Sequence, residues 1–223
     1  MIPYRMNPLG LKLGGGNMPN KGLIFYDPLD KEIPVGGKIK SGQLLYRFGG
    51  ASVTQPTVET FKGIKCTLFT STTAMFHADN MPVQGNPVTM SIWYCSKYTG
   101  YSYNSPILCY WKEGVSVPRL AINDTLNPSF GEAGENHLSV ALQADRWYFL
   151  ALTYSNGIGC FYIDGENIYE QPHTVNIAPG EVLIQYGEYQ PGRAGRLASP
   201  RIYNRLLSAS EIAALAKEHN PTA

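Results

Sequence analysis

Residues 146–165, RWYFLALTYSNGIGCFYIDG, decide the fold class because they hold two apolar runs and a closing Asp-Gly pair. Both strand parities of the first run are apolar, with Trp147, Phe149 and Ala151 on one and Tyr148, Leu150 and Leu152 on the other. A strand without a polar face is buried on both sides, so this run is expected at the centre of a sheet. Asp164-Gly165 favours a two-residue type I′ turn, whose central residues both need positive φ. The stretch therefore predicts sheet structure with a tight hairpin.

The closing segment, residues 199–212 (SPRIYNRLLSASEI), predicts one short helix after a last strand. Ser208 as N-cap and Glu211 at the third helical position form a capping box, while Leu207 and Ile212 are placed for a hydrophobic staple. Ile212, Leu215 and Ala216 share one helix face, and Asn220-Pro221 is expected to end the helix. That face predicts packing against the sheet, which is a structural role.

The remaining sequence indicates many short strands joined by tight turns. Gly (23), Pro (16) and Tyr (15) are abundant, whereas charged residues make up only 16% of the 223 residues, a mixture that favours an all-β chain over long helices. The expected strands are residues 22–26, 44–48, 63–69, 88–96, 107–111, 119–122, 137–141, 147–154, 158–163, 167–170, 181–186 and 195–203. Their spacing is typical of a sandwich or a barrel.

Two parts of unequal size are expected along the chain. Residues 1–21 lack a hydrophobic period and are dense in Gly, Pro and Asn, which predicts an extended N-terminal arm. Such an arm is either a disordered terminus or a segment that docks on a neighbouring subunit. Residues 22–223 are long enough to form one β-sandwich domain with a substantial core.

Charge, hydrophobicity and cysteine spacing argue against a nucleic-acid partner, a membrane span and a Cys-x-x-Cys site. The formal net charge of +1 gives no global field that would attract nucleic acid, and no apolar run reaches the ~20 residues that span a bilayer. Four widely spaced cysteines, Cys66, Cys95, Cys109 and Cys160, form no Cys-x-x-Cys pair and are interpreted as buried thiols. The alternative is a disulfide between Cys95 and Cys109, which would need an oxidising compartment.

These residues together resemble the laminin-G-like jelly rolls of the concanavalin A-like lectin and glucanase superfamily. The matching segments are 22–30, 147–154, Tyr162-Ile163-Asp164-Gly165 and 201–212, and the match is weak between residues 31 and 87. The resemblance implies an all-β sandwich of two antiparallel sheets of about six or seven strands. It also implies a binding surface on the concave sheet or along its rim loops. The superfamily includes lectins, hydrolases and adhesive modules, so the fold alone does not assign a function.

The sequence offers little for catalysis. Glycoside hydrolases of this superfamily carry paired carboxylates as Glu-x-Asp-x-x-Glu on one strand, and this chain lacks that pattern. Glu132 and Glu135 lie in a glycine-rich stretch that is interpreted as a loop. The four histidines are isolated, without metal-ligand spacing. We therefore expect a chain that is not an enzyme, although a triad assembled from distant residues stays an alternative.

A calcium site is the cofactor that the resemblance implies, because family members often bind Ca²⁺ at loop ends. Asp27 and Asp30 are its expected ligands, since hard cations need clustered oxygen atoms. The alternative role of these two aspartates is turn formation around Pro28.

The expected ligand-binding residues lie in the tyrosine-rich segment, residues 94–111. Tyr98, Tyr101 and Tyr103 alternate with Ser, Gly and Asn before Trp111. Tyrosine combines apolar area with a polar tip, so such loops suit sugar faces or protein partners. The alternative is a wide hairpin whose tyrosines cover the edge of the sandwich.

These observations predict a non-enzymatic binding or structural module that recognises glycan or protein. The initial Met1, the lack of an export signal and the Gly/Pro-rich arm favour a bacteriophage-type virion component, such as a capsid decoration or fibre domain, made in the host cytoplasm and attached through its arm. The alternatives are a secreted or surface bacterial lectin and a divergent glycan-active hydrolase. Because the Trp147 strand, the Asp-Gly turn and the capped helix each have a sufficient structural cause, the search for function moves to residues 1–30 and the tyrosine-rich segment.

Overall fold

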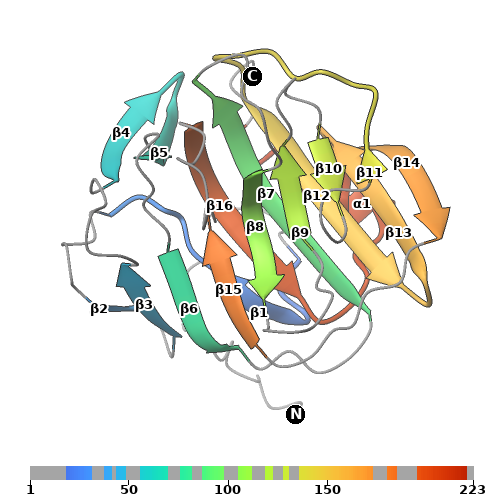
Figure 1. The fold of residues 1–223 in the computed structure, drawn as a ribbon, viewed down its shortest axis with the longest axis horizontal. Helices are drawn as coiled ribbons and strands as arrows, with labels where there is room; N and C mark the ends of the chain where they lie inside the picture. Colours follow the sequence, from blue (N-terminus) through green and yellow to red (C-terminus); the bar gives the residue numbers. More distant parts are fainter. Residues whose placement is uncertain are drawn as a thin grey trace, which may run out of the picture.

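The computed structural model shows two antiparallel β-sheets packed face to face, with one short helix (Figure 1). The residues that it describes are 19–31, 38–41, 44–48, 56–69, 76–81, 87–97, 105–111, 119–122, 128–130, 136–172, 180–184 and 195–219. The expected all-β sandwich is confirmed. The arm at residues 1–21 falls almost wholly outside the described residues, so the division of the chain at residue 21 stays a prediction.

Sheet A contains the segments that the sequence marked most clearly. Its eight strands are β1 (Leu23–Tyr26), β4 (Thr57–Phe61), β5 (Ile64–Phe69), β7 (Val88–Ser96), β12 (Tyr148–Ser155), β13 (Ile158–Ile163), β14 (Glu166–Pro172) and β16 (Gly195–Tyr203). Their order is β14-β13-β12-β7-β16-β5-β4, with β1 also paired to β16. The predicted central strand is confirmed, because Leu150 in β12 pairs with Ile163 on one side and Ile92 on the other.

Sheet B lies in front of sheet A in Figure 1 and also has eight strands. They are β2 (Lys38–Ser41), β3 (Leu44–Phe48), β6 (Phe76–Met81), β8 (Ser105–Trp111), β9 (Arg119–Ile122), β10 (Pro128–Phe130), β11 (Asn136–His137) and β15 (Gly180–Ile184). Their order is β11-β10-β9-β8-β15-β6-β3-β2. Each sheet has more strands than the six or seven that the resemblance implied, and the sequence did not reveal β2, β4, β6 and β10. The strand expected at residues 137–141 is wrong beyond His137, where β11 ends.

Sheet A is packed on both of its faces, although its edge strand β14 is largely exposed. Its inner face packs on sheet B in a core that includes Leu150, Leu152 and Ile92, all at most 3% exposed. On its outer face a second apolar cluster joins Trp93, Phe149 and other strand residues to the helix. The two parities of β12 therefore enter two different cores, as the alternation along a strand requires.

The helix α1 (Ala209–Leu215) covers part of that outer face, behind sheet A in Figure 1. The predicted capping box is present: the Ser208 side chain accepts from the Glu211 N–H, and the Glu211 side chain accepts from the Ser208 N–H. Ile212 and Leu215 are fully buried. No helix in the described part of the chain has the length and hydrophobicity to cross a bilayer.

The helix ends earlier than Asn220-Pro221, the expected stop. Helical structure stops at Leu215, and the next four residues form turns. Two of these, Glu218 and His219, contact Arg201 and Ser199 of β16. Side-chain contacts with the sheet therefore accompany the end of the helix before proline is reached.

Candidate functional site

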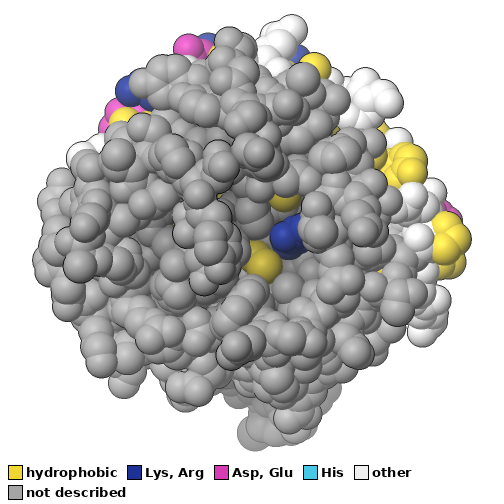
Figure 2. Space-filling model, viewed as in Figure 1, with side chains coloured by type: hydrophobic (Ala, Val, Ile, Leu, Met, Phe, Trp, Pro, Cys, Tyr) yellow, Lys and Arg dark blue, Asp and Glu magenta, His cyan; other side chains and the backbone are white. Residues whose placement is uncertain are grey.

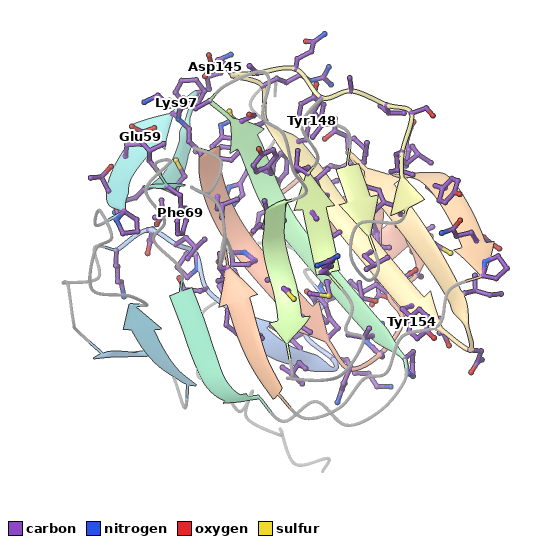
Figure 3. The ribbon with its side chains drawn as sticks, in the orientation of Figure 1. Glu59, Phe69, Lys97, Asp145, Tyr148 and Tyr154 are labelled. Atoms are coloured by element: carbon purple, nitrogen blue, oxygen red, sulfur yellow. The ribbon has the colours of Figure 1, made fainter. Side chains whose placement is uncertain are left out.

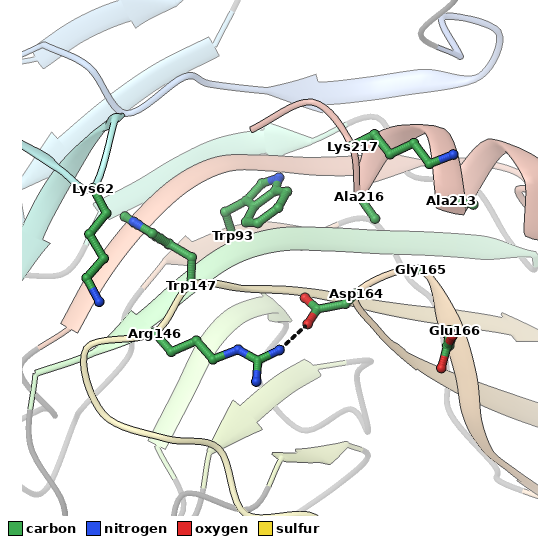
Figure 4. A pocket seen from close by; sticks show the side chains of 10 residues that line it. All are labelled: Lys62, Trp93, Arg146, Trp147, Asp164, Gly165, Glu166, Ala213, Ala216 and Lys217. Carbon is green, nitrogen blue, oxygen red and sulfur yellow. Dashed lines mark hydrogen bonds and ion pairs between the residues drawn. The ribbon is translucent and has the colours of Figure 1, made fainter. Parts of the chain in front are cut away.

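A cavity of about 810 Å³ lies on the outer side of sheet A, beside α1 (Figure 4). Its lining comes from the β4–β5 turn, β7, the two residues before β12, the β13–β14 turn, and α1 with the turn after it. The lining residues are Lys62, Trp93, Arg146, Trp147, Asp164, Gly165, Glu166, Ala213, Ala216 and Lys217. The volume falls within the range of small-molecule sites, which run from about 300 to 1,000 Å³.

Two indole rings form the base of the cavity. Trp147 is 4% exposed, and its Nε1–H donates to the carbonyl oxygen of Phe61 at 3.0 Å. Trp93 is 3% exposed, and its ring centroid lies 5.6 Å from that of Phe149 and 5.7 Å from that of His219. Its Nε1–H is buried and has no hydrogen-bond partner among the described residues. Figure 4 shows this indole at the centre of the lining.

The β13–β14 turn forms one wall and carries the predicted Asp-Gly pair. The φ angles are +51° at Asp164 and +90° at Gly165, so the expected positive φ is confirmed at both positions. Asp164 Oδ1 accepts from the N–H of Phe149 at 2.9 Å, and Oδ2 accepts from Arg146 at 3.3 Å. Burial raises the pKa of this carboxyl group, while the Phe149 N–H and the Arg146 guanidinium oppose that rise.

Gly165 also sets the distance between this turn and the helix. A Cβ atom at this position would lie 3.1 Å from Ala213 Cα and 3.1 Å from Ala216 Cβ. The glycine is therefore required twice, once by its φ angle and once by the close approach of the helix. The two alanines permit that approach because they are small.

The opposite wall is formed by Lys62 in the β4–β5 turn. Its Nζ donates to the carbonyl oxygen of Asp145 at 2.6 Å and lies 5.5 Å from the centre of the Phe61 ring. The Asp145 carboxylate, in turn, pairs with Arg196 at 3.1 Å, and Arg196 also pairs with Glu59 at 2.5 Å. Glu59 and Asp145 lie at the same end of the molecule in Figure 3. This network fixes the β4–β5 turn against the start of β12.

Charged contacts at both ends hold α1 over the outer face. Arg205 binds the Glu211 carboxylate through two nitrogens, and this pair lowers the pKa of Glu211 to about 2. Beyond the helix, the 1%-exposed side chain of Arg201 donates to Glu218 at 2.6 Å. The wall formed by α1 is therefore anchored to β16 and to the segment after it.

Ser199, His219 and Glu218 lie together but do not form a nucleophilic triad. Ser199 Oγ is 2.8 Å from His219 Nε2, and Glu218 Oε2 approaches the same nitrogen at 3.8 Å instead of the other ring nitrogen. Ser199 is only 1% exposed. A catalytic serine needs substrate access and a histidine oriented through its second nitrogen. This cluster is a structural contact between β16 and the C-terminal turn.

The ligand-binding residues expected in the tyrosine-rich segment lie mostly outside the described residues. This applies to Tyr98, Tyr101 and Tyr103, while Trp111 ends β8, opposite Glu181 of β15. β7 and β8 are not the two arms of one hairpin, because β7 belongs to sheet A and β8 to sheet B. The expected covering of the sandwich edge by the tyrosines falls outside the described residues. The role of the segment in ligand binding stays a prediction.

Figure 2 shows the described side chains that are visible from the side of sheet B. Hydrophobic side chains gather at the edge that corresponds to β13 and β14. There Ile158, Ile168 and Tyr169 are 36% to 44% exposed. These side chains form a sheet edge and are separate from the cavity lining.

The two aspartates expected to bind calcium occupy the turn after β1. Asp27 Oδ1 accepts from the N–H of Leu29 at 2.7 Å, which is the turn role considered as the alternative. Asp30 Oδ1 is buried without a hydrogen bond in the described part. The described residues contain no group of three or more acidic, histidine or cysteine side chains placed to hold a metal. Calcium binding at Asp27 and Asp30 stays a prediction.

All four cysteines are free thiols. The alternative disulfide is absent: Cys95 lies in β7 of sheet A, whereas Cys109 lies in β8 of sheet B. Burial raises the pKa of Cys66 and Cys109 to about 12, which keeps these two thiols protonated. Cys160 is only partly buried. The interpretation as buried thiols is thus confirmed for Cys66, Cys95 and Cys109.

The cavity unites residues that the sequence marked as structural with others that it did not mark. Trp147 and the Asp164-Gly165 turn were assigned structural causes, and those causes are present. Trp93, Lys62 and Lys217 carried no local signal, since each is an ordinary residue of a strand, a turn or a helix end. Trp93 lies in an apolar run and Trp147 directly before another, but the pairing of β7 with β12 was needed to bring the two residues together.

The fold is shared with known proteins. A laminin G family model, described as the concanavalin A-like lectin/glucanases superfamily, matches residues 70–213 and confirms the resemblance drawn from the sequence. No curated protein matches the chain.

Among solved structures, domain 4 of AbnA, a GH43 extracellular arabinanase from Geobacillus stearothermophilus, in complex with arabinotriose, is 15% identical with a TM-score of 0.70. The match covers 87% of this chain and 98% of that one. A mutant Trypanosoma rangeli sialidase displaying trans-sialidase activity is 17% identical, with a TM-score of 0.64 over 93% of this chain and 34% of that one.

The receptor binding domain of botulinum neurotoxin C/D mosaic serotype is 14% identical, with a TM-score of 0.62 over 88% of this chain and 51% of that one. The chain thus spans about a third of the sialidase and half of the toxin domain. At these identities the similarity shows the fold alone.

Proposed function

Because this chain belongs to the concanavalin A-like lectin/glucanases superfamily, we propose that it is a non-catalytic domain that binds carbohydrate in the cavity beside α1. The observation that carries this proposal is the cavity lining itself. Two indoles form the base, and charged side chains from separate elements stand around it. A sugar has apolar C–H faces and a rim of hydroxyl groups, so it can contact aromatic rings and polar side chains at once.

The state of Asp164 favours binding over hydrolysis at this site. Glycoside hydrolases need two carboxyl groups that are free to act as acid, base or nucleophile. Both Asp164 oxygens are already used to hold the turn, one by Phe149 and the other by Arg146. Glu166 is the other carboxylate of the lining. Among the described residues, Glu166 is thus the one carboxylate of the lining without a side-chain hydrogen bond or ion pair.

The similar structures support a carbohydrate ligand without identifying it. The AbnA domain has nearly the same extent as this chain and was solved with arabinotriose. The sialidase match covers only a third of that protein. A domain of this fold can therefore accompany glycan-active proteins while serving as a binding unit.

Arg146→Ala tests the proposed site. The side chain lines the cavity and is 55% exposed, so its loss should reduce the free energy of unfolding by less than about 1 kcal/mol. A charged hydrogen bond to a ligand is worth more, and we expect affinity to fall about tenfold. The measurement is titration calorimetry with oligosaccharides selected on an array of neutral and acidic glycans. Lys65→Ala, on β5 outside the lining, is the matched control.

The tyrosine-rich segment is the alternative location of the sugar site, and a double variant tests it against the cavity. Tyr101→Ala combined with Tyr103→Ala should leave the affinity unchanged if the sugar occupies the cavity. If this variant loses binding while Arg146→Ala retains it, the site belongs on the segment and the cavity proposal is wrong. If no glycan on the array binds the intact chain, carbohydrate binding itself is wrong. The virion setting and the attachment role of residues 1–21 stay predictions from the sequence.

A further inference from the structure

Cationic side chains from three separate elements surround the cavity. Lys62 comes from the β4–β5 turn, Arg146 precedes β12, and Lys217 follows α1. The two acidic lining residues, Asp164 and Glu166, flank a single glycine in one hairpin turn. Figure 4 shows Lys62 and Arg146 on one side of Trp93, with Lys217 near the helix end. Positive charge is therefore distributed around the cavity, whereas negative charge is confined to one wall.

The hydrogen bonds already formed leave mostly donors for a ligand. Lys62 Nζ has three donor hydrogens and gives one to a neutral carbonyl, and Arg146 uses one nitrogen for Asp164. In the described part of the chain, no carboxylate forms an ion pair with Lys62 or Lys217. Asp164 has both oxygens engaged. The uncommitted groups are thus several charged donors and a single carboxylate, Glu166.

Lys62 is also held in place before any ligand arrives. Its contacts with the Asp145 carbonyl and the Phe61 ring fix the ammonium group, and the Arg196 network fixes Asp145. A fixed cation loses less conformational freedom on binding than a free lysine side chain would. A neutral ligand would partly dehydrate these cations without supplying a counter-charge, which is unfavourable.

We propose that the cavity selects an acidic oligosaccharide, whose carboxylate groups are bound separately by the cationic side chains of the lining, Lys62, Arg146 and Lys217. This inference rests on the proposed carbohydrate-binding function and adds the ligand class. The carboxylate groups satisfy the charged donors, and the sugar ring contacts only the small exposed parts of Trp93 and Trp147, which are 3% and 4% exposed. Glu166 repels the carboxylate groups from the hairpin wall and so directs them toward the lysines.

The test uses pairs of glycans that differ in one group. Uronic-acid oligosaccharides are presented beside the same oligosaccharides after carboxyl reduction, which converts each acid to a neutral hexose. We expect the intact chain to bind at least one acidic member about tenfold more tightly than its reduced partner. That preference should decrease between low and high salt, because screening weakens exposed charge pairs.

The outcomes separate the two proposals. Equal binding of acidic and reduced partners overturns the acidic-ligand inference and leaves carbohydrate binding in place. Binding of neither partner, nor of any other glycan on the array, overturns both. A preference that persists unchanged in high salt also contradicts the role assigned to the cations.

Charge variants locate the preference within the cavity. Lys62→Gln and Lys217→Gln should each reduce acidic-glycan affinity about three- to fivefold, the size expected of exposed ion pairs, with little effect on neutral glycans. Glu166→Gln should raise acidic-glycan affinity by a similar factor. Lys65→Gln changes the net charge equally but lies outside the lining, so it should have no effect. If Lys65→Gln matches Lys62→Gln, or if Glu166→Gln lowers affinity, the charges do not act within the cavity.

Discussion

The two faces of sheet A are built from the same strands but differ in how completely they are covered. On the inner face, even-numbered residues of β12 such as Leu150 and Leu152 pack on sheet B in an apolar core. On the outer face, odd-numbered residues such as Phe149 pack under α1, and beside them lies the cavity. A whole sheet packs on the inner face, whereas only a short helix packs on the outer face.

The size of the covering element explains this difference. α1 has seven residues and is about 10 Å long at 1.5 Å per residue. β7 has nine residues and extends about 30 Å at 3.3 Å per residue. A short helix can bury only part of such a sheet. Beside the helix, the cavity lies over Trp93 and Trp147, which are 3% and 4% exposed, and charged side chains surround it.

Leu150→Ala should give the largest effect, because the inner face is filled. Truncating a fully buried leucine should lower the free energy of unfolding by about 3 kcal/mol. Trp93→Phe on the outer face should cost less than about 1.5 kcal/mol, because it enlarges an existing cavity and removes a buried N–H without a described partner. Urea unfolding measures both. A larger loss for Trp93→Phe would mean that the outer face is the better packed one.

Gly165→Ala should have an intermediate effect, at about 2 kcal/mol, because it combines a positive φ with a clash against α1. Gly63→Ala is a close control: its φ is +81° and a Cβ there would meet nothing within 4 Å. The difference between the two losses of thermal stability isolates the contact between the hairpin and the helix. If both variants lose the same thermal stability, α1 can move away from the hairpin with little loss of stability. Ligand affinity would then show whether the cavity still binds after that movement.

Glu211→Gln should have the smallest effect, about 1 kcal/mol at neutral pH, through loss of the charged pair with Arg205, because glutamine can still accept the Ser208 N–H of the capping box. The folded state holds the pKa of Glu211 at about 2, below its ordinary value. The unfolded chain therefore takes up a proton first, so this contribution is complete above about pH 4.5 and disappears as the pH falls toward 2. The stability curves of the two proteins should converge in acid. Parallel curves down to pH 2 would contradict the role of the Glu211 charge.

Local signals predicted the elements whose sequence patterns were strong. The double apolar parity of β12, the Asp-Gly turn and the Ser208 capping box all act within a few residues, so the chain displays them directly. The four strands that were missed have weak patterns. β2 is KIKS, β4 has no fully buried residue, β6 contains Asp and Asn, and β10 has three residues beginning with proline. Their pairing partners, rather than their own propensities, place them in the sheets.

The sequence by itself determined the all-β class, the central strand, the hairpin and the helix with its N-cap, because each depends on neighbouring residues. Only the tertiary structure decided that Lys62, Trp93, Arg146 and Lys217 surround one cavity. The first and last of these residues, Lys62 and Lys217, are 155 positions apart in the sequence (217 − 62). Strand order, the close approach at Gly165 and the length of α1 bring them together, and none of these is encoded in a local pattern. The β12–β14 hairpin region and the capped helix, whose structural roles were clear from the sequence, also contribute residues to the candidate binding site.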